Sequence, residues 1–289
     1  MTIPARSPAV VHVDLDGYSA ICAAHGWSVP AGPDHLFLSG LSNALEALAQ
    51  ARLNATLFVI AQDLADPAKL ALLRKAVEQG HEIGSHTISH RRLTSLSTRE
   101  KAMEIGGSRE RIGASLGVPV LGFRAPAFDL DREGIDLVAQ AGYRYDSSLF
   151  PNARSARRIQ VERVSEWPHR LLPARELLEL PLPGFAPLPL PYHPCYSLVL
   201  GTWYFRNGLE RSARVGAPLV LLFHLTDFAD PLPAESVPGW KRRFFTLSYL
   251  SAAEKRKRCG VMLAEVTSRY QVGRTAELLE APSVPAAAS

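Results

Sequence analysis

The sequence predicts an α/β fold in which parallel strands alternate with helices that cover them. Short apolar runs suited to buried strands recur along the chain, and clearly marked helices separate them through the first half. Of the 289 residues, 47% are hydrophobic and 21% are charged, a balance typical of a globular protein with a sizeable core. Together these observations favour a parallel sheet or barrel with its helices outside.

Five strands and four helices are expected in the first half of the chain. The expected strands are Ala9–Val13, Ala55–Ala61, His81–Ser85, Val118–Phe123 and Tyr143–Asp146. The expected helices are Leu36–Leu53, Asp66 to Gly80, Ser97 to Gly117, and Asp131–Ala141. Asp66-Pro67 offers a capping carboxylate before a first-turn proline, and Ser97 with Glu100 forms a capping box.

The second half begins with a different composition. Residues Pro151 to Pro194 are rich in proline and contain one clear strand, Leu177–Leu182. We expect the tract Pro181 to Pro194 to form a long ordered loop or a semi-rigid arm. Beyond it we expect a strand, two helices and a frayed tail, at Ala217–Phe223, Leu250–Ser268, Ala276–Glu280 and Pro282–Ser289.

The charge balance argues against nucleic acid as a partner. The formal net charge is only +4, and no basic stripe with interleaved aromatic residues occurs. The clusters Lys241–Arg243 and Lys255–Arg258 favour a solvated helix face. The alternative is contact with phosphate groups or an anionic membrane surface.

The cysteines and the apolar runs bear on the cellular compartment. Cys22, Cys195 and Cys259 are odd in number and widely spaced, which indicates neither a disulfide framework nor a Cys-x-x-Cys metal site. No segment resembles a signal peptide or reaches the length of a transmembrane span. We therefore expect a cytoplasmic protein.

Two carboxylates stand two residues apart where the first strand ends. Because strand side chains alternate faces, Asp14 and Asp16 should point the same way. In parallel α/β folds, sites are built at the carboxyl ends of strands. The alternative is a turn, since Asp16-Gly17 is also common turn chemistry.

Two histidines four residues apart follow the third strand. If Thr87 to His90 begin a helical turn, His86 and His90 lie on one face and bind a single ion. With a carboxylate from the first strand they complete a two-histidine, one-carboxylate set that leaves room for water and substrate. The alternative is a pair of surface histidines.

Two further polar residues end strands. Arg124 can hold a carboxylate by paired hydrogen bonds, and Pro126 stiffens a turn that can aim a backbone N–H at the site. His224 ends the most apolar strand. A lone histidine there is more often a core or rim residue, but its position at another strand end favours function.

With these residues in place, the sequence resembles the polysaccharide deacetylases of the NodB-homology group, carbohydrate esterase family four. The resemblance runs from about Val10 to about Asp230 and rests on ATLFVIA, GHEIGSHTISH followed by Arg92-Leu93, and GFRAPAF. It implies a distorted (β/α) barrel of about seven parallel strands and a metal-dependent deacetylation. GYRYDSSLFP, LLELPLP and the C-terminal helix resemble the branch found beside exopolysaccharide and exosortase gene clusters. We expect one deacetylase domain over residues 1–289, with a core at about 8–230 and a helical extension at about 240–281.

The resemblance implies the ligands of one divalent metal ion. By position they are Asp16, His86 and His90, and zinc is favoured over cobalt, nickel or manganese. The sequence departs from the commoner family pattern, in which the two aspartates are adjacent, because Leu15 separates Asp14 from Asp16.

The resemblance also implies the catalytic roles. Asp14 would be the general base with Arg124 as its partner, and Ala127 would supply a backbone N–H to the oxyanion. His224 would be the general acid. The usual Asp-Trp segment that tunes this histidine is not recognisable, and Asp146 is the nearest candidate for its role.

The expected substrate is an N-acetylated sugar or glycan, carried on a nucleotide or a lipid. The two basic clusters would then contact phosphate groups or the membrane surface, and the proline-rich arm with Tyr192, Tyr196 and Trp203 would form an aromatic wall. Two other functions stay open: hydrolysis of a non-sugar amide such as a cyclic imide or formamide, and glycan binding without catalysis.

Overall fold

The structure is a computed structural model that describes residues 6–172, 176–184, 191–233, 237, 239–241, 245 and 249–280. Its strands are β1 Pro8–Asp14, β2 Thr56–Val59, β3 Glu82–Ser85, β4 Gly122–Phe123, β5 Tyr145–Asp146, β6 His169–Arg170, β7 Leu178–Glu179, β8 Leu219–His224 and β9 Gln271–Gly273. Its α-helices are α1 Tyr18–His25, α2 His35–Ala51, α3 Pro67–Glu78, α4 Thr98–Ala102, α5 Ser108–Leu116, α6 Arg132–Gln140, α7 Ala153–Ile159, α8 Pro194–Leu200, α9 Thr202–Val215, α10 Ala252–Arg269 and α11 Thr275–Glu280.

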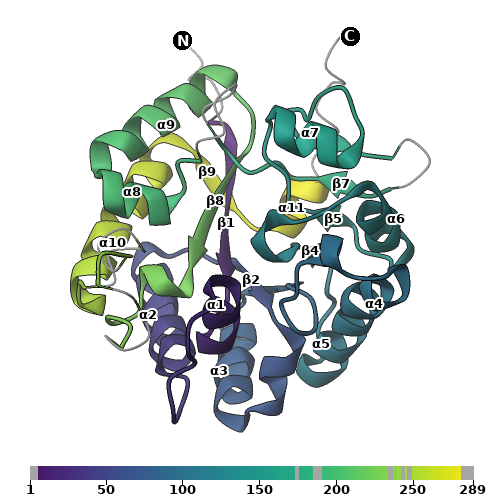
Figure 1. Cartoon of the computed structure of the whole chain (residues 1–289). Helices are drawn as coiled ribbons and strands as arrows, with labels where there is room; N and C mark the ends of the chain where they lie inside the picture. The colour runs from purple at the N-terminus through teal and green to yellow at the C-terminus, as the bar shows by residue number, and fades with distance from the viewer. Residues whose placement is uncertain are drawn as a thin grey trace.

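A single curled sheet holds all of these strands. The strand order is β6-β7-β5-β4-β3-β2-β1-β8, with β9 also paired to β1 (Figure 1). Every pair is parallel except β6 with β7. The sheet curls into a half-barrel, which confirms the predicted α/β fold of the distorted barrel type. The seven strands expected from the sequence correspond to β1–β5, β7 and β8.

The helices form a belt around the outside of the sheet. Helix α10 contacts α2, α8 and α9 on one side, and α2 contacts α3, which in turn contacts α5 (Figure 1). On the other side α6 contacts α4 and α7. The capping signals in the sequence mark these helices well: Asp66 caps α3, and the Ser97–Glu100 capping box opens α4.

The two faces of β1 explain how an apolar strand presents polar groups. Val11 and Val13 face the helices, where they join a core that includes Phe37 of α2. The alternate residue Val10 faces the concave side, where Leu278 and Leu279 of α11 pack against its cluster. Each fully buried Val or Leu contributes about 1.5–3 kcal/mol to folding. Further along this concave face come His12 and Asp14, so the same alternation that builds the core delivers polar residues to the carboxyl end.

The segment after β5 contains more helix than the sequence suggested. Helix α7 lies in the stretch where only a strand was expected, and its cap is Asn152. Helices α8 and α9, as well as α1, were not predicted. Pro194 stands in the first turn of α8, where its missing N–H costs nothing, so proline begins a helix here. Residues 185–190 of the expected arm lie outside the described residues, as do those of the expected tail.

Within the described residues, no helix combines the length and the apolar character needed to cross a membrane.

The close contact between β4 and β5 yields a stability prediction. A Cβ at Gly122 would lie 2.0 Å from the Tyr145 ring, which is buried and whose hydroxyl is held by Thr56 and Thr275. Gly122→Ala should therefore lower the free energy of unfolding by about 1–3 kcal/mol, measured by urea denaturation. The matched control is Gly113→Ala, whose Cβ meets nothing nearer than 3.5 Å and should cause no loss. Equal midpoints for the two variants would contradict the prediction.

Candidate active site and metal centre

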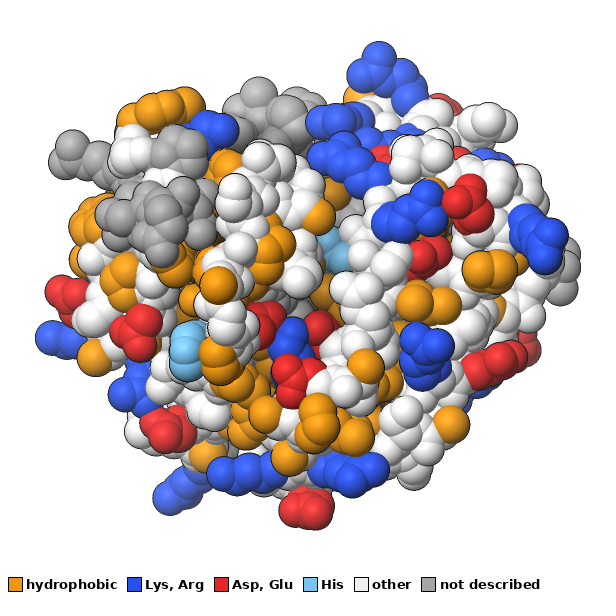
Figure 2. All heavy atoms as spheres, turned by 60° about the horizontal axis from the view of Figure 1, so that its bottom comes forward, with side chains coloured by type: hydrophobic (Ala, Val, Ile, Leu, Met, Phe, Trp, Pro, Cys, Tyr) orange, Lys and Arg blue, Asp and Glu red, His pale blue; other side chains and the backbone are white. Residues whose placement is uncertain are grey.

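The polar side chains predicted from the sequence gather at the carboxyl ends of the strands. Figure 2 looks toward this end of the molecule: a groove crosses the face, a histidine lies in it, and Lys and Arg side chains gather on part of its rim. Asp14 ends β1 and His224 ends β8, and the two residues are directly opposite each other in the parallel pairing. The register of the sheet thus places an acid and a histidine side by side.

Asp16, His86 and His90 form a compact group. Asp16 Oδ1 lies 3.4 Å from His86 Nε2 and 3.3 Å from His90 Nε2. Burial alone would raise the pKa of Asp16, but the two histidines hold it well below its ordinary value. Two of the facing atoms, Asp16 Oδ1 and His90 Nε2, are buried without a hydrogen-bond partner in the described part of the structure. Buried polar atoms in that state are costly unless they bind something.

This group fits a divalent cation. One carboxylate oxygen and two imidazole nitrogens lie within 4.8 Å of one another, and this is a donor set that zinc-like ions take. The structure therefore brings together the three residues that the sequence nominated, and their role as ligands stays a prediction.

The loop that carries the two histidines is not the helical turn expected from the sequence. Thr87 and His90 have positive φ angles of 68° and 60°, a left-handed conformation that costs a non-glycine residue about 1–2 kcal/mol. The surrounding hydrogen bonds hold the loop in place. Glu104 accepts the N–H groups of Ile88 and Ser89 at 2.8 and 2.9 Å, and the Thr87 hydroxyl accepts that of His90 at 3.0 Å.

Glu104 reaches this loop from a widened helical turn. It lies in Met103–Gly107, a π-helical turn between α4 and α5. The helix expected from Ser97 to Gly117 is therefore present as α4 and α5 joined by one π-helical turn. Such turns occur frequently at functional sites. The sequence offers no signal for it.

Arg124 is fully buried and satisfied by a set of specific partners. Its Nη1 donates to Asp14 Oδ1 at 2.9 Å, and its Nη2 donates to His12 Nδ1 at 2.8 Å and to the Ser147 hydroxyl at 2.7 Å. Its Nε donates to the Ser147 carbonyl at 2.7 Å, and its guanidinium lies over the Phe58 ring. Arg124 thus contacts Asp14 as predicted, but through one hydrogen bond rather than the paired bonds expected from the sequence.

The main chain of Arg124 orients one of the candidate metal ligands. His86 Nδ1 donates to the Arg124 carbonyl at 2.8 Å, which leaves His86 Nε2 free to face Asp16. Ligating histidines are commonly oriented in this way through their second nitrogen.

His12 completes the setting of Arg124 from the concave side. Burial and the Arg124 charge hold the pKa of His12 well below its ordinary value, so its imidazole is neutral. Nδ1 can then accept from Arg124 while Nε2 donates to the Thr275 hydroxyl at 3.1 Å.

His224 faces the predicted base, but its acidic neighbour is not the one expected. His224 Nε2 lies 3.8 Å from Asp14 Oδ2. Asp146, expected to tune this histidine, instead accepts the hydroxyl and N–H of Ser148. The carboxylate beside His224 is that of Asp227, which accepts the His224 backbone N–H at 2.8 Å. Burial raises the pKa of Asp227 to about 6, although the nearby His224 charge opposes the rise.

Ala127 lies on the rim of an open cleft that His224 also lines. Ala127 and Phe128 have successive positive φ angles of 52° and 56°, and non-glycine residues in this conformation cluster at functional sites. The cleft has a volume of about 420 Å³. The turn after Arg124 thus lies at the cleft, and the role of the Ala127 N–H stays a prediction.

The lining of the cleft is basic rather than a purely aromatic wall. Three arginines, Arg92, Arg154 and Arg158, line it against one acid, Asp129, which pairs with Arg158 at 3.4 Å. The expected aromatic wall is only partly present. Tyr196 lines the cleft, but Tyr192 is fully buried and Trp203, although 73% exposed, is not among the lining residues.

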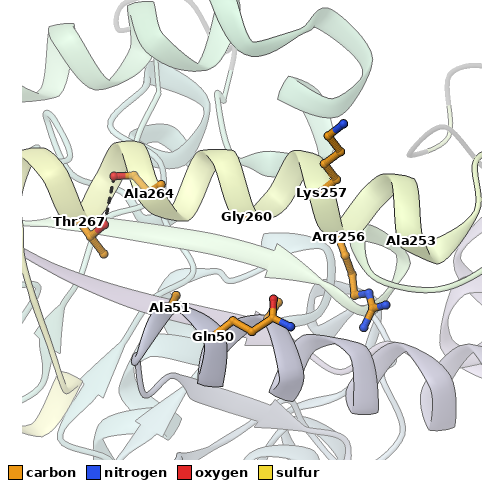
Figure 3. A pocket seen from close by; sticks show the side chains of 9 residues that line it. Gln50, Ala51, Ala253, Arg256, Lys257, Gly260, Ala264 and Thr267 are labelled. Carbon is orange, nitrogen blue, oxygen red and sulfur yellow. Dashed lines mark hydrogen bonds between the residues drawn. The ribbon is translucent and has the colours of Figure 1, made fainter.

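One of the predicted basic clusters is partly structural. Lys255 is buried and donates to the Thr226 and Ala229 carbonyls, both at 3.0 Å, so it is unavailable to phosphate. Arg256 and Lys257 instead line a separate groove between α2 and α10 that contains none of the site residues (Figure 3). In the other cluster, Lys241 lies over the rings of Trp27 and Trp240. Arg242 and Arg243 lie outside the described residues.

Sequence reasoning overlooked three residues that hold the site. His12 carried a usable signal, because it precedes Asp14 and Asp16 at the same two-residue spacing and so shares their face. Asp227 lies three residues after His224, a local signal as well. Glu104 carried none, since its contact with the histidine loop depends on the π turn.

The family comparison agrees with the resemblance seen in the sequence. Residues 32–145 match the sequence profile described as polysaccharide deacetylase. Chitin deacetylase 1 of Cryptococcus neoformans var. grubii is 31% identical over 98 residues, which are 34% of this chain and 20% of that protein. The chain thus spans about a fifth of the length of this curated relative. The predicted family resemblance is confirmed, and placement in the exopolysaccharide-associated branch stays a prediction.

Solved structures share the fold over nearly the whole chain. A polysaccharide deacetylase candidate from Mycobacterium smegmatis has a TM-score of 0.66 at 18% identity, covering 97% of this chain and 92% of that one. Puue allantoinase has a TM-score of 0.65 at 13% identity, covering 96% and 91%. At these identities the likeness concerns the fold alone.

The Glu104 contacts predict an effect on metal binding. Glu104→Ala should weaken zinc binding by about 10–100-fold, because the loop that carries His86 and His90 loses its anchor. Competition against a chromophoric chelator measures the affinity of the metal-free protein. Glu110→Ala, a nearby exposed glutamate, is the matched control and should bind zinc as the unmodified protein does. Unchanged affinity in Glu104→Ala would show that the loop holds its shape without the carboxylate.

Proposed function

We propose that this chain is a metal-dependent deacetylase that hydrolyses an N-acetyl group on a sugar. The observation that carries the proposal is the separation of two carboxylates on one strand end. Asp16 faces two histidines, whereas Asp14 is paired with Arg124 and faces His224. An amide hydrolase of this kind needs a metal ligand and a separate base, and the arrangement supplies both.

The metal would be held by Asp16, His86 and His90, and zinc suits this donor set best. When bound, the cation polarises the amide carbonyl and lowers the pKa of water.

The remaining steps fall to side chains of the protein. Asp14 takes the proton of the attacking water, and Arg124 fixes its Oδ1 so that Oδ2 is presented to the site. The backbone N–H of Ala127 stabilises the charge that develops on the carbonyl oxygen. His224, protonated, gives a proton to the departing amine, which is a poor leaving group as an anion.

The cleft supports an anionic substrate. Arg154 and Arg92 lie at its rim and are exposed, so they are available to a phosphate or carboxylate group. A sugar carried on a nucleotide or a lipid pyrophosphate has such groups next to its N-acetyl group. The basic rim attracts that charge while His224 and Ala127 line the same cleft.

The division of labour is testable by three substitutions. His86→Ala should lose the zinc held by Asp16, His86 and His90, and activity with it, because one ligand of three is removed. Asp14→Asn and His224→Ala should keep the zinc of that group yet lose about two to four orders of magnitude in the rate of acetate release. Controls are His35→Ala, at an exposed position, and Asp136→Asn, at a half-buried position of α6; neither residue belongs to the proposed site or lines the cleft. If Asp14→Asn loses the zinc, Asp14 is a ligand and the proposed base is wrong.

Substrate charge is testable on helix α7. Arg154→Ala should raise KM for a nucleotide-linked N-acetyl sugar by about 1.5–5-fold and leave kcat unchanged, because an exposed ion pair contributes about 0.2–1 kcal/mol. The free N-acetyl sugar should show no such change. Arg157→Ala, on the same helix but not in the cleft lining, is the matched control. An equal change in KM for both variants, or no change in either, would argue against an anionic substrate in this cleft. The non-sugar alternative is tested separately, by assaying hydrolysis of a substrate panel that includes cyclic imides.

A further inference from the structure

A second group of metal-binding side chains lies in the cleft and includes His224. The ligand atoms of His193, Cys195 and His224 all lie within 4.8 Å of one another. Cys195 Sγ is 3.0 Å from His193 Nδ1, and the rings of His193 and His224 are 5.7 Å apart. All three residues line the cleft of about 420 Å³, so an ion can reach them from solvent.

The fold builds this group from two adjacent elements. His193 is the residue before α8, Pro194 sets the first turn, and Cys195 follows on the same turn. Helix α8 lies against β8, the strand that ends in His224. His193 is 3% exposed and is one of the residues that line the cleft.

The chemistry of the three atoms points to a particular class of ion. Two imidazole nitrogens and one thiol sulfur match the mixed nitrogen–sulfur sets that bind zinc tetrahedrally, with the fourth position open to water. A thiolate ligand favours soft or borderline ions over magnesium or calcium. The first group, Asp16 with His86 and His90, contains no sulfur, so the two groups differ in their preferred ions.

We propose that His193, Cys195 and His224 form a second, inhibitory site for zinc or a similar thiophilic ion. Binding releases the Cys195 proton to solvent and forms a metal–sulfur bond, with no change of oxidation state. The inhibitory part rests on the proposed function: a His224 nitrogen that coordinates an ion no longer carries a proton for the leaving amine. Zinc would then be required at one site and inhibitory at the other.

Cobalt(II) titration of the metal-free protein tests the site itself, without any assay of activity. A thiolate bound to cobalt gives an intense near-ultraviolet charge-transfer band, which the sulfur-free first group cannot produce. The band should saturate at one equivalent for this site, persist in His86→Ala and disappear in Cys195→Ser. Cys22→Ser, which removes a buried cysteine of α1 that belongs to neither group, should keep the band. Cobalt binding without the band in the unmodified protein would overturn the proposal.

Zinc titration tests the inhibitory part. Acetate release should rise as the first site fills and then fall by at least tenfold as zinc is raised further. Relative to its own maximum, Cys195→Ser should lose that fall, and His193→Gln should behave the same way if Cys195→Ser is poorly folded. Cys22→Ser should show the full fall. A charge-transfer band without zinc inhibition would retain the second site but overturn its inhibitory role. No activity at any zinc concentration, with the band present, would count against the proposed function alone.

Discussion

The buried pair between Arg124 and Asp14 is the interaction on which the site depends. Removing two charges from water costs several kcal/mol for each ion, so such a pair persists only when every donor is satisfied. Here the guanidinium bonds to Asp14, His12 and both the carbonyl and hydroxyl of Ser147, while its ring-facing side rests on Phe58. The Arg124 carbonyl orients His86 at the same time. One residue therefore sets the geometry of the proposed base and of a candidate metal ligand.

Most of the fold was predictable because its strands are apolar and its helices carry strong local signals. The seven expected strands and the capping box at Ser97 all appear in the structure, and a second capping box at Ser251 opens α10. Two of the missed helices share a cause: α8 and α9 lie after a proline-rich stretch that indicates a loop, although Pro194 in fact starts a helix. The strand bounds were too long where pairing is limited, as in β4 and β5, because register with neighbours, not local composition, ends a strand.

The site was predictable where it follows from strand ends and not where it depends on distant contacts. Asp14, Asp16, Arg124 and His224 each end a strand or follow one closely, so the parallel arrangement alone brings them together. The left-handed backbone at Thr87 and His90 is held by hydrogen bonds that the N–H groups of the loop donate to Glu104, a residue on another element. The acid beside His224 is Asp227, because its carboxylate accepts the His224 N–H, whereas the Asp146 carboxylate accepts the Ser148 hydroxyl. The sequence does not indicate which way either carboxylate turns. The fold itself does not choose a substrate, since a polysaccharide deacetylase candidate and an allantoinase match it almost equally.

The position of α11 has a consequence for the order in which the protein is completed during translation. His12, near the start of the chain, bonds to Thr275 at the head of α11, and Glu82 accepts the N–H groups of Thr275 and Ala276. Strand β1 likewise pairs with β8 and β9, which the ribosome releases more than 200 residues later. A nascent chain can form the local helices early. The setting of Arg124 through His12 therefore waits until Thr275 has emerged, so the proposed base and the candidate metal ligands are not fully held in place in a partly synthesised chain.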